Sequence, residues 1–159
     1  MASKIRTLRS SAEQGAHASQ LILANMYEAG EFLTQDSYLA KKCHHQAAKQ
    51  GNAGAQCALA LLLMRVWFEK SAEQRIGEAQ HMKWYYENAI AWFKKSAEQG
   101  LAEAQLQLGK MYKYGVGGDV EYAKALELLT KSAAQSDACA QFHLGSMYED
   151  GLGVAQDYA

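Results

Sequence analysis

Internal repetition constrains the fold of this chain more than any other feature. The tetrapeptide Ser-Ala-Glu-Gln begins at Ser11, Ser71 and Ser96. A second pattern, Met-Tyr with a glycine three residues after the tyrosine, begins at Met26, Met111 and Met147. Equivalent positions lie 36 residues apart, from Gly15 to Gly51 and from Gly100 to Ser136. Similarity at a fixed period of this length is typical of a repeat protein built from one supersecondary unit.

The unit at 101–136 is predicted to be a pair of amphipathic helices. Helical spacing of three and four residues links two sets of apolar side chains: Leu101, Ala104, Leu108, Met111 and Tyr112 in the first helix, and Tyr122, Ala125, Leu126, Leu129 and Ala133 in the second. The glycines at 115–118 separate them, because glycine weakens a helix interior. We call the first helix A and the second helix B, and expect Gly15, Gly51 and Gly100 to end other B helices.

Neither helix can bury its apolar stripe alone, so successive hairpins have to stack. We therefore predict an all-α fold, an α/α superhelical solenoid of antiparallel helix hairpins, as one domain over residues 1–159. Its expected parts are a partial helix B at 1–15, a repeat at 16–51, an irregular part at 52–100, a repeat at 101–136 and a partial repeat at 137–159. Gly109 costs about 1 kcal/mol in mid-helix, which indicates that a neighbouring backbone passes close to it.

Composition narrows the classes of partner. Sixteen Lys and Arg against seventeen Asp and Glu leave a net charge of −1, so neither nucleic acid nor an anionic membrane is expected as a partner.

The longest apolar run, 58–64, is far shorter than the roughly 20 residues of a transmembrane helix. Residues 1–9 lack the apolar stretch of a secretory signal, so the chain is predicted to be cytoplasmic, or periplasmic if a leader was removed. Three cysteines do not describe a disulfide framework.

One set of residues carries a family resemblance that covers nearly the whole chain. The residues are Ala104 to Tyr112, Gly115-Val116-Gly117 and Tyr122 to Ala125, and residues 151–158 repeat the loop signature, with Ala155 where the family often has proline. They resemble the Sel-1-like repeat family, a relative of the tetratricopeptide repeats. Cysteine-rich secreted members bridge two positions eight residues apart, and the chain departs from that subclass. Those positions here hold Ala48 and Gln56, Ala97 and Gln105, and Ala133 and Gln141.

The stretch between Gly51 and Gly100 breaks the period, because it has 49 residues and no glycine-rich loop. Helix A and helix B features recur there without a breaker between them. We expect each pair to fuse, giving long helices at about 53–74 and 78–99 with a turn at 75–77, and therefore an enlarged central hairpin. A loop insertion is the alternative.

Aromatic residues concentrate in this stretch. We expect Trp67, Phe68, Trp92 and Phe93 to be core, since they match the Leu128-Leu129 pair of the regular repeat. Trp84 stands where that repeat has Gly109, a position too small for an indole. Either the hairpin repacks around Trp84, or the ring emerges and forms an anchor patch with Arg65 and Tyr85.

The remaining residue clusters and motifs give little support for a metal-binding or catalytic site. Cys43, His44 and His45 are consecutive, so their side chains point about 100° apart and cannot converge on one metal ion. We expect His45 to fill the position of Leu129, and no metal or cofactor. Cys43 and Cys57 lie about equally far along the chain from the turn at Gly51, so they could face each other across a helix pair. We expect any such contact to be a chance one. Serine-nucleophile, phosphate-loop and metalloprotease motifs are missing from the sequence, so we predict that the chain is not an enzyme and has no small-molecule substrate.

The polar positions of helix A differ between repeats, as expected for a surface matched to one partner. We therefore place a protein or peptide partner on the concave helix A surface. The expected contact residues, including the aromatic patch, are Asn25, Glu28, Arg65, Trp84, Tyr85, Gln107, Lys110, Lys113, Tyr114, His143 and Ser146. By contrast, a glutamine recurs in every helix A and is expected to make a structural hydrogen bond to a neighbouring turn. These glutamines are Gln20, Gln56, Gln80, Gln105 and Gln141.

The resemblance implies a scaffold or adaptor for protein–protein interaction. An immunity protein that neutralises a secreted bacterial toxin is the alternative, because some relatives have that role. Hydrolase activity has been suggested for other relatives, but no group of residues in this sequence supports it. The sequence begins inside a helix B and stops where another is due, so we expect either that it was trimmed or that its ends pack against something.

Overall fold

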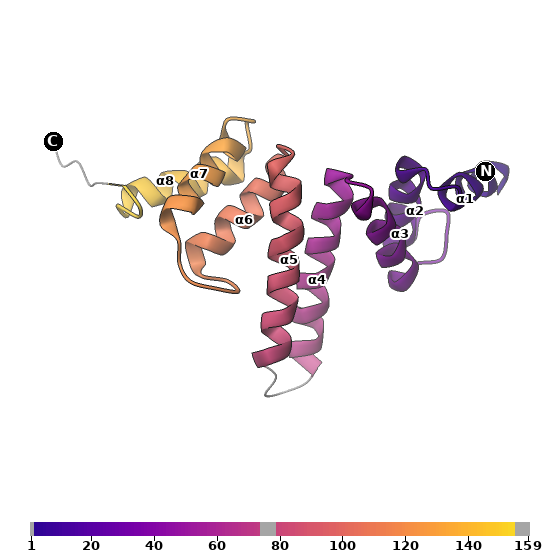
Figure 1. The fold of residues 1–159 in the computed structure, drawn as a ribbon, viewed down its shortest axis with the longest axis horizontal. Coiled ribbons are helices and arrows are strands. Elements are labelled where there is room, and N and C mark those ends of the chain that lie inside the picture. The colour runs from indigo at the N-terminus through magenta and orange to yellow at the C-terminus, as the bar shows by residue number, and fades with distance from the viewer. Residues whose placement is uncertain (1, 74–78, 155–159) are drawn as a thin grey trace. The chain divides into compact units, whose positions relative to one another are not determined.

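A computed structural model describes the backbone of residues 2–73 and 79–154, and side chains within these ranges apart from residue 2, residues 69–73 and residues 79–81. These residues form eight α-helices and no strand (Figure 1). The helices are α1 (Ala2–Glu13), α2 (His17–Ala29), α3 (Ser37–Lys49), α4 (Ala53–Glu73), α5 (Ala79–Glu98), α6 (Ala102–Tyr114), α7 (Tyr122–Ala133) and α8 (Ala138–Glu149). The predicted all-α solenoid of antiparallel hairpins is confirmed.

Local signals account for where the helices begin and end. Gly30 and Gly115 take left-handed conformations after α2 and α6, and their N–H groups close the last turns. At the start of α3 the Asp36 carboxylate accepts from Leu39 N–H, and Asp137 caps α8 in the same way. The repeating glycine signature therefore marks the ends of A helices, as the sequence predicts.

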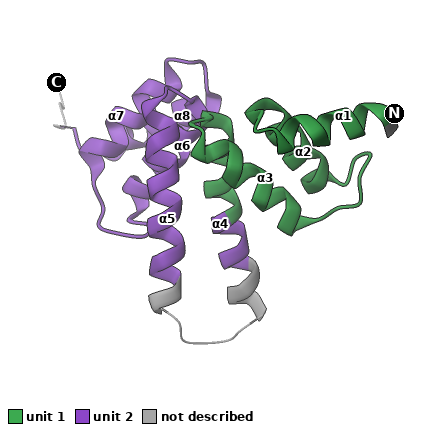
Figure 2. Cartoon of the chain, turned by 45° about the vertical axis from the view of Figure 1, so that its right-hand side comes forward, with its two compact units in different colours: residues 1–62 green, residues 63–159 purple. Residues whose placement is uncertain are grey.

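The chain divides into two compact units, residues 1–62 and 63–159, and the division falls within α4 (Figure 2). In the first unit, α2 and α3 form a hairpin that buries Leu23, Ala24, Ala40 and Ala47. His44 is also fully buried there, whereas His45 is only half-buried. The expectation that His45 fills the Leu129 position is wrong: His44 fills it, because it precedes Gly51 by seven residues, as Leu129 precedes Ser136.

In the second unit, α6, α7 and α8 pack in succession. Their shared core is built from one cluster of buried residues: Leu106, Ala125, Leu129, Ala140 and Met147. Gly109 of α6 faces α7 so closely that a Cβ atom would lie 2.9 Å from Leu129 Cγ and 3.5 Å from the Ala125 carbonyl oxygen. The close approach predicted at Gly109 is therefore present, and its nearest atom belongs to a side chain.

The irregular stretch forms two long helices. α4 has 21 residues and α5 has 20, about 30 Å each at 1.5 Å per residue, and neither breaks at Met64 or Glu87. This confirms the long helices predicted at 53–74 and 78–99. The predicted turn at 75–77 lies outside the described residues. Beyond Leu62, α4 runs beside the first half of α5 (Figure 1), where the Trp67 and Tyr85 ring centroids are 6.2 Å apart.

The aromatic residues of these helices are not all core. Phe93 is fully buried, Trp67 and Trp92 are half-buried, and Phe68 is 59% exposed. The core prediction for Phe68 is wrong, because the fused helix keeps the phase of its first half. Its buried stripe passes through Leu59, Leu62 and Leu63 to Val66 and Trp67 at three- and four-residue steps, and the next residue points about 100° away.

Candidate partner-binding site

The expected contact residues fall into three groups in the structure. α6 and α8, the A helices of two successive repeats, carry six of them: Gln107, Lys110, Lys113, Tyr114, His143 and Ser146. The second group, on α4 and α5, consists of Arg65, Trp84 and Tyr85. The third is Asn25 and Glu28 on α2, which belong to the other compact unit.

The first group forms a connected set of contacts across two helices. Lys113 is 7% exposed, and its Nζ donates to Ser146 Oγ at 2.5 Å. Ser146 Oγ in turn donates to the His143 carbonyl oxygen at 3.1 Å. Tyr114 Oη lies 3.5 Å from His143 Nδ1, and the two rings meet edge to face. We call Lys110, Lys113, Tyr114, His143 and Ser146 the Lys113 cluster.

Electrostatics within the Lys113 cluster favour an uncharged imidazole. Partial burial lowers the pKa of His143 below its usual value near 6.5, and the positive charges of Lys110 and Lys113 lower it further. Lys113 Nζ also lies 5.3 Å from the Tyr114 ring centroid, within cation–π range. The cluster therefore presents two cationic side chains beside an aromatic ring that is 56% exposed.

The second group includes an exposed tryptophan. Trp84 is 52% exposed, so of the two outcomes expected for it, the ring emerges. Its ring meets Tyr85 edge to face at 5.0 Å between centroids, and its carbonyl oxygen accepts from Asn88 Nδ2. Arg65 is exposed on α4. The contact with the Tyr85 ring holds the indole against its own helix, and Trp84 remains about half exposed.

The remaining expected residues differ in their availability. Asn25 is exposed on α2. Glu28 is half-buried, and its Oε2 lies 3.5 Å from His44 Nε2, so it takes part in the interior of its own hairpin. Gln107 donates to the Glu103 carboxylate at 2.7 Å, one turn earlier on α6.

One aromatic neighbour of the Lys113 cluster is not among the contact residues expected from the sequence. Phe142 contacts the His143 ring at 5.6 Å between centroids and is 73% exposed. It follows Leu106 by one 36-residue period, and Leu106 is buried in the core cluster. The repeat pattern therefore predicts a core residue at Phe142, and only the structure places its ring beside His143.

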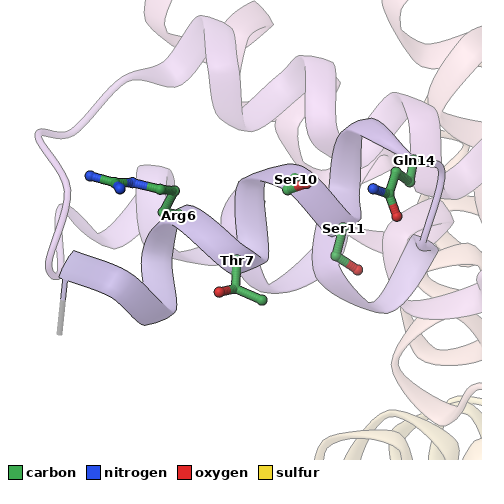
Figure 3. Close-up of a pocket in the computed structure, with 5 residues that line it drawn as sticks. All are labelled: Arg6, Thr7, Ser10, Ser11 and Gln14. Atoms are coloured by element: carbon green, nitrogen blue, oxygen red, sulfur yellow. The ribbon is translucent and has the colours of Figure 1, made fainter.

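A hollow of about 440 Å³ lies on α1 in the other unit (Figure 3). Five residues line it: Arg6, Thr7, Ser10, Ser11 and Gln14. They come from one helix and the turn that follows it, and Ser11 Oγ is already bonded to Ser19 Oγ at 2.9 Å. The hollow is therefore a surface depression rather than an enclosed ligand site.

Thiol and imidazole groups offer no metal site in the part of the chain that the structure describes, where no group of three His, Cys, Asp or Glu side chains converges. Cys43, Cys57 and Cys139 are free thiols. Burial raises the pKa of Cys43, so its thiol stays protonated and is a poor nucleophile. None of the helices within the described ranges is both long and apolar enough for a bilayer crossing.

Comparison with known families identifies the repeat. The model of the Sel1 repeat matches residues 17–52, 65–75, 86–101, 102–137 and 140–159, which make up most of the chain. The chain belongs to the Sel1 repeat family. The two full-length matches have the 36-residue period, two of the shorter matches begin in the long helices α4 and α5, and the third begins in α8. Proteins of this family are generally scaffolds for protein–protein interaction, and the fold is typically non-enzymatic.

Solved structures show the same fold. A Sel1 repeat protein from Oxalobacter formigenes is 26% identical with a TM-score of 0.77, and the match covers 96% of this chain and 57% of that chain. A protective antigen present in uropathogenic Escherichia coli strains, which displays the same fold, is 30% identical with a TM-score of 0.50 and coverages of 97% and 38%. The Sel1 chain therefore spans less than two thirds of either structure. A search of curated proteins gave no significant match.

Proposed function

We propose that this Sel1 repeat chain is an interaction scaffold that binds a segment of a protein partner on the face of α6 and α8 that carries the Lys113 cluster. The observation that carries the proposal is the hydrogen bond from Lys113 to Ser146, which ties the A helices of two successive repeats. A surface held in this way loses little conformational entropy when a partner binds. The exposed ring of Tyr114 supplies a residue type that is enriched at interaction hot spots.

Site-specific photo-crosslinking in the source cells tests this proposal. Tyr114 is replaced by p-benzoylphenylalanine, which preserves an aromatic ring at a position that is already exposed. The control carries the same group at Val120, an exposed loop residue of the same unit. We expect a cross-linked protein from position 114 that is missing or much weaker from position 120. Identical products from both positions, or none from position 114, would contradict the proposal.

The exposed Trp84 is proposed as a second contact with the same partner. Tryptophan is one of the residue types enriched at interface hot spots, and Trp84 is 52% exposed. Trp84→Ala should reduce recovery of the cross-linked partner while the helical circular dichroism spectrum stays unchanged. Full recovery with this variant would remove Trp84 from the surface.

The identity of the captured protein separates the two roles that remain open. Several housekeeping proteins would support an adaptor. Recovery of one toxic enzyme, whose activity the purified chain suppresses, would instead support an immunity protein.

A further inference from the structure

Lys113 is unusual among the described lysines of its unit because its side chain is buried and has no counter-charge. No carboxylate among the described side chains lies within 4.0 Å of its Nζ, and its contacts are Ser146 Oγ and the Tyr114 ring. An ammonium group has three N–H donors, and the serine accepts one. Burying a charge is costly unless it is paired, so the environment of Lys113 favours the arrival of an anion.

Several other lysines of the second unit are paired with carboxylates. Lys124 pairs with Glu121 at 2.6 Å, and Lys131 pairs with Glu127 at 2.5 Å, each on a solvent-exposed part of α7. Lys110, like Lys113, makes no ion pair with a described carboxylate. The Lys113 cluster therefore concentrates two uncompensated positive charges on a chain whose net charge is −1.

Two hydrogen bonds place the Lys113 charge beside His143. The positive charge of Lys110, three residues earlier on α6, lowers the pKa of the same imidazole. Ser146 donates its proton to the His143 carbonyl oxygen, which leaves its own oxygen as an acceptor for Lys113. The hydroxyl therefore fixes the ammonium group without neutralising it. Partial burial strengthens its attraction for an anion, because the effective dielectric is lower than in water.

We propose that the Lys113 cluster binds a side-chain carboxylate from an acidic peptide segment of the protein partner. Lys113 and Lys110 donate to the carboxylate, and the exposed Tyr114 ring covers an apolar side chain next to it. This inference rests on the proposed function and specifies the chemistry of the partner. Two lysines match the charge of one or two carboxylates, whereas tight nucleic-acid binding depends on many phosphate contacts.

Peptide titrations on the intact chain test this assignment. The probes are a short, terminally blocked, dye-labelled peptide rich in glutamate with a single tryptophan, and its counterpart with glutamine in place of every glutamate. Fluorescence anisotropy should show the glutamate peptide binding about tenfold or more tightly than the glutamine peptide, with the difference shrinking as salt is added. An RNA oligonucleotide of uridines serves as the polyanion control and should bind more weakly than the glutamate peptide.

Three methionine variants locate the binding site. Lys113→Met keeps the length and apolar stem of the side chain while removing its charge, and Lys110→Met does the same at a position that is less buried. Lys131→Met is the matched control, because Lys131 already has a carboxylate partner on α7. We expect each of the first two to weaken the glutamate peptide about fivefold to tenfold, and the control to leave its affinity unchanged. If Lys113→Met unfolds, Lys110→Met still decides the question.

His143 gives a second readout. Its pKa lies below 6.5 in the free chain because of partial burial and because of the positive charges of Lys110 and Lys113 on α6. The Tyr114 hydroxyl on α6 also faces its ring. A bound carboxylate would offset the lysine charges and raise that pKa. Binding should therefore tighten as the pH falls below about 6.5, and a His143→Gln variant should lose this dependence.

The outcomes separate this inference from the function on which it rests. Equal affinity for the two peptides, tighter binding of the RNA, or unchanged affinity in both lysine variants would overturn the carboxylate assignment. Cross-linking from position 114 would in that case still support a protein partner. Loss of the cross-link as well would count against the interaction surface itself.

Discussion

The side-chain amide of Gln105 donates to the backbone carbonyl oxygen of Ala97, eight residues earlier, at 3.2 Å. The same bond joins Gln20 to Ala12, Gln56 to Ala48 and Gln141 to Ala133. Each ties the first turns of a helix to the end of the helix before it. The hydrogen bond therefore recurs at equivalent positions of successive repeats.

The glutamine bonds also reach the following helix B. Gln135 Nε2 donates to Gln105 Oε1 at 2.9 Å, and Gln50 Nε2 donates to Gln20 Oε1 at the same distance. A buried amide with both of its polar atoms bonded is fully compatible with the interior. The repeated glutamine therefore has the structural role that its recurrence predicts, except at Gln80, whose side chain lies outside the described residues.

Gln105→Ala should destabilise the second unit by about 1–3 kcal/mol, because it removes two hydrogen bonds of a buried amide, one to the Ala97 carbonyl oxygen and one from Gln135 Nε2. Gln141→Ala is the matched control: Gln141 is exposed and its bond is longer, at 3.4 Å, so a change within about 0.5 kcal/mol is expected. Urea unfolding followed by tryptophan fluorescence reports on this unit, since Trp67, Trp84 and Trp92 all belong to it. Equal losses in the two variants would contradict a specific role for the buried bond.

His44→Leu should stabilise the first unit by roughly 1 kcal/mol. His44 is fully buried, neither ring nitrogen has a hydrogen-bond partner, and its contact with Glu28 is an ion-pair approach of 3.5 Å. The equivalent positions hold Phe93 and Leu129, both fully buried, so an apolar side chain suits this site. Replacing an unsatisfied buried polar group by an apolar one of similar size is favourable. Hydrogen exchange of the α3 amides measures the change, with the half-buried His45→Leu as the control that should show little effect.

The same residue makes the stability of this unit depend on pH. Burial lowers the pKa of His44 below 6.5, and the nearby Glu28 carboxylate, 3.5 Å from His44 Nε2, offsets only part of that effect. The unfolded chain therefore takes up a proton more readily than the folded chain. The stability due to neutral His44 is complete above about pH 6.5 and is lost as the pH falls through the lower folded-state pKa. The advantage of His44→Leu over the wild type should grow on acidification, and a constant difference would contradict this account.

Several features of the fold could be predicted because their causes are local. Gly30 and Gly115 end α2 and α6 by taking left-handed conformations, and the absence of a helix-breaking residue in 55–74 lets α4 continue. The identity of the buried histidine could also be predicted, since counting seven residues back from Gly51 gives His44. Phe68 illustrates a different limit. Its exposure depends on the helical phase that continues from the first half of α4. The sequence prediction instead aligns Phe68 with a separate helix B.

The candidate site was predicted only as a set of variable positions. The sequence places Lys113 and Ser146 on equivalent faces of two A helices, but they are 33 residues apart and their hydrogen bond follows from the stacking of the hairpins. Nothing in the sequence indicates that Lys113 is buried, because its neighbours Tyr112 and Tyr114 are less buried than it is. The charge that lacks a partner, which carries the inference about the ligand, is therefore a property of the packed structure.

Gly117 occupies a backbone site that only glycine suits. Its φ is +80°, and an added Cβ would lie 2.6 Å from Tyr86 Cβ and 3.2 Å from Ile90 Cδ1 on α5. The contact recurs one period later, where a Cβ on Gly153 would lie 2.8 Å from Tyr122 Cβ. The second glycine of the loop therefore allows each loop to pack against the helix that precedes its own hairpin.

Gly117→Ala should destabilise the second unit by roughly 2 kcal/mol or more, because alanine is strained at this positive φ and its methyl group collides with Tyr86. Gly118→Ala is the matched control one residue away: no atom lies within 4 Å of its added Cβ, and its φ is outside the positive range. We expect that variant to stay within about 0.5 kcal/mol of the wild type. Urea unfolding followed by tryptophan fluorescence compares the two. Similar losses would mean that general loop stiffness matters, while a large loss confined to Gly117→Ala would locate the constraint in the contact with α5.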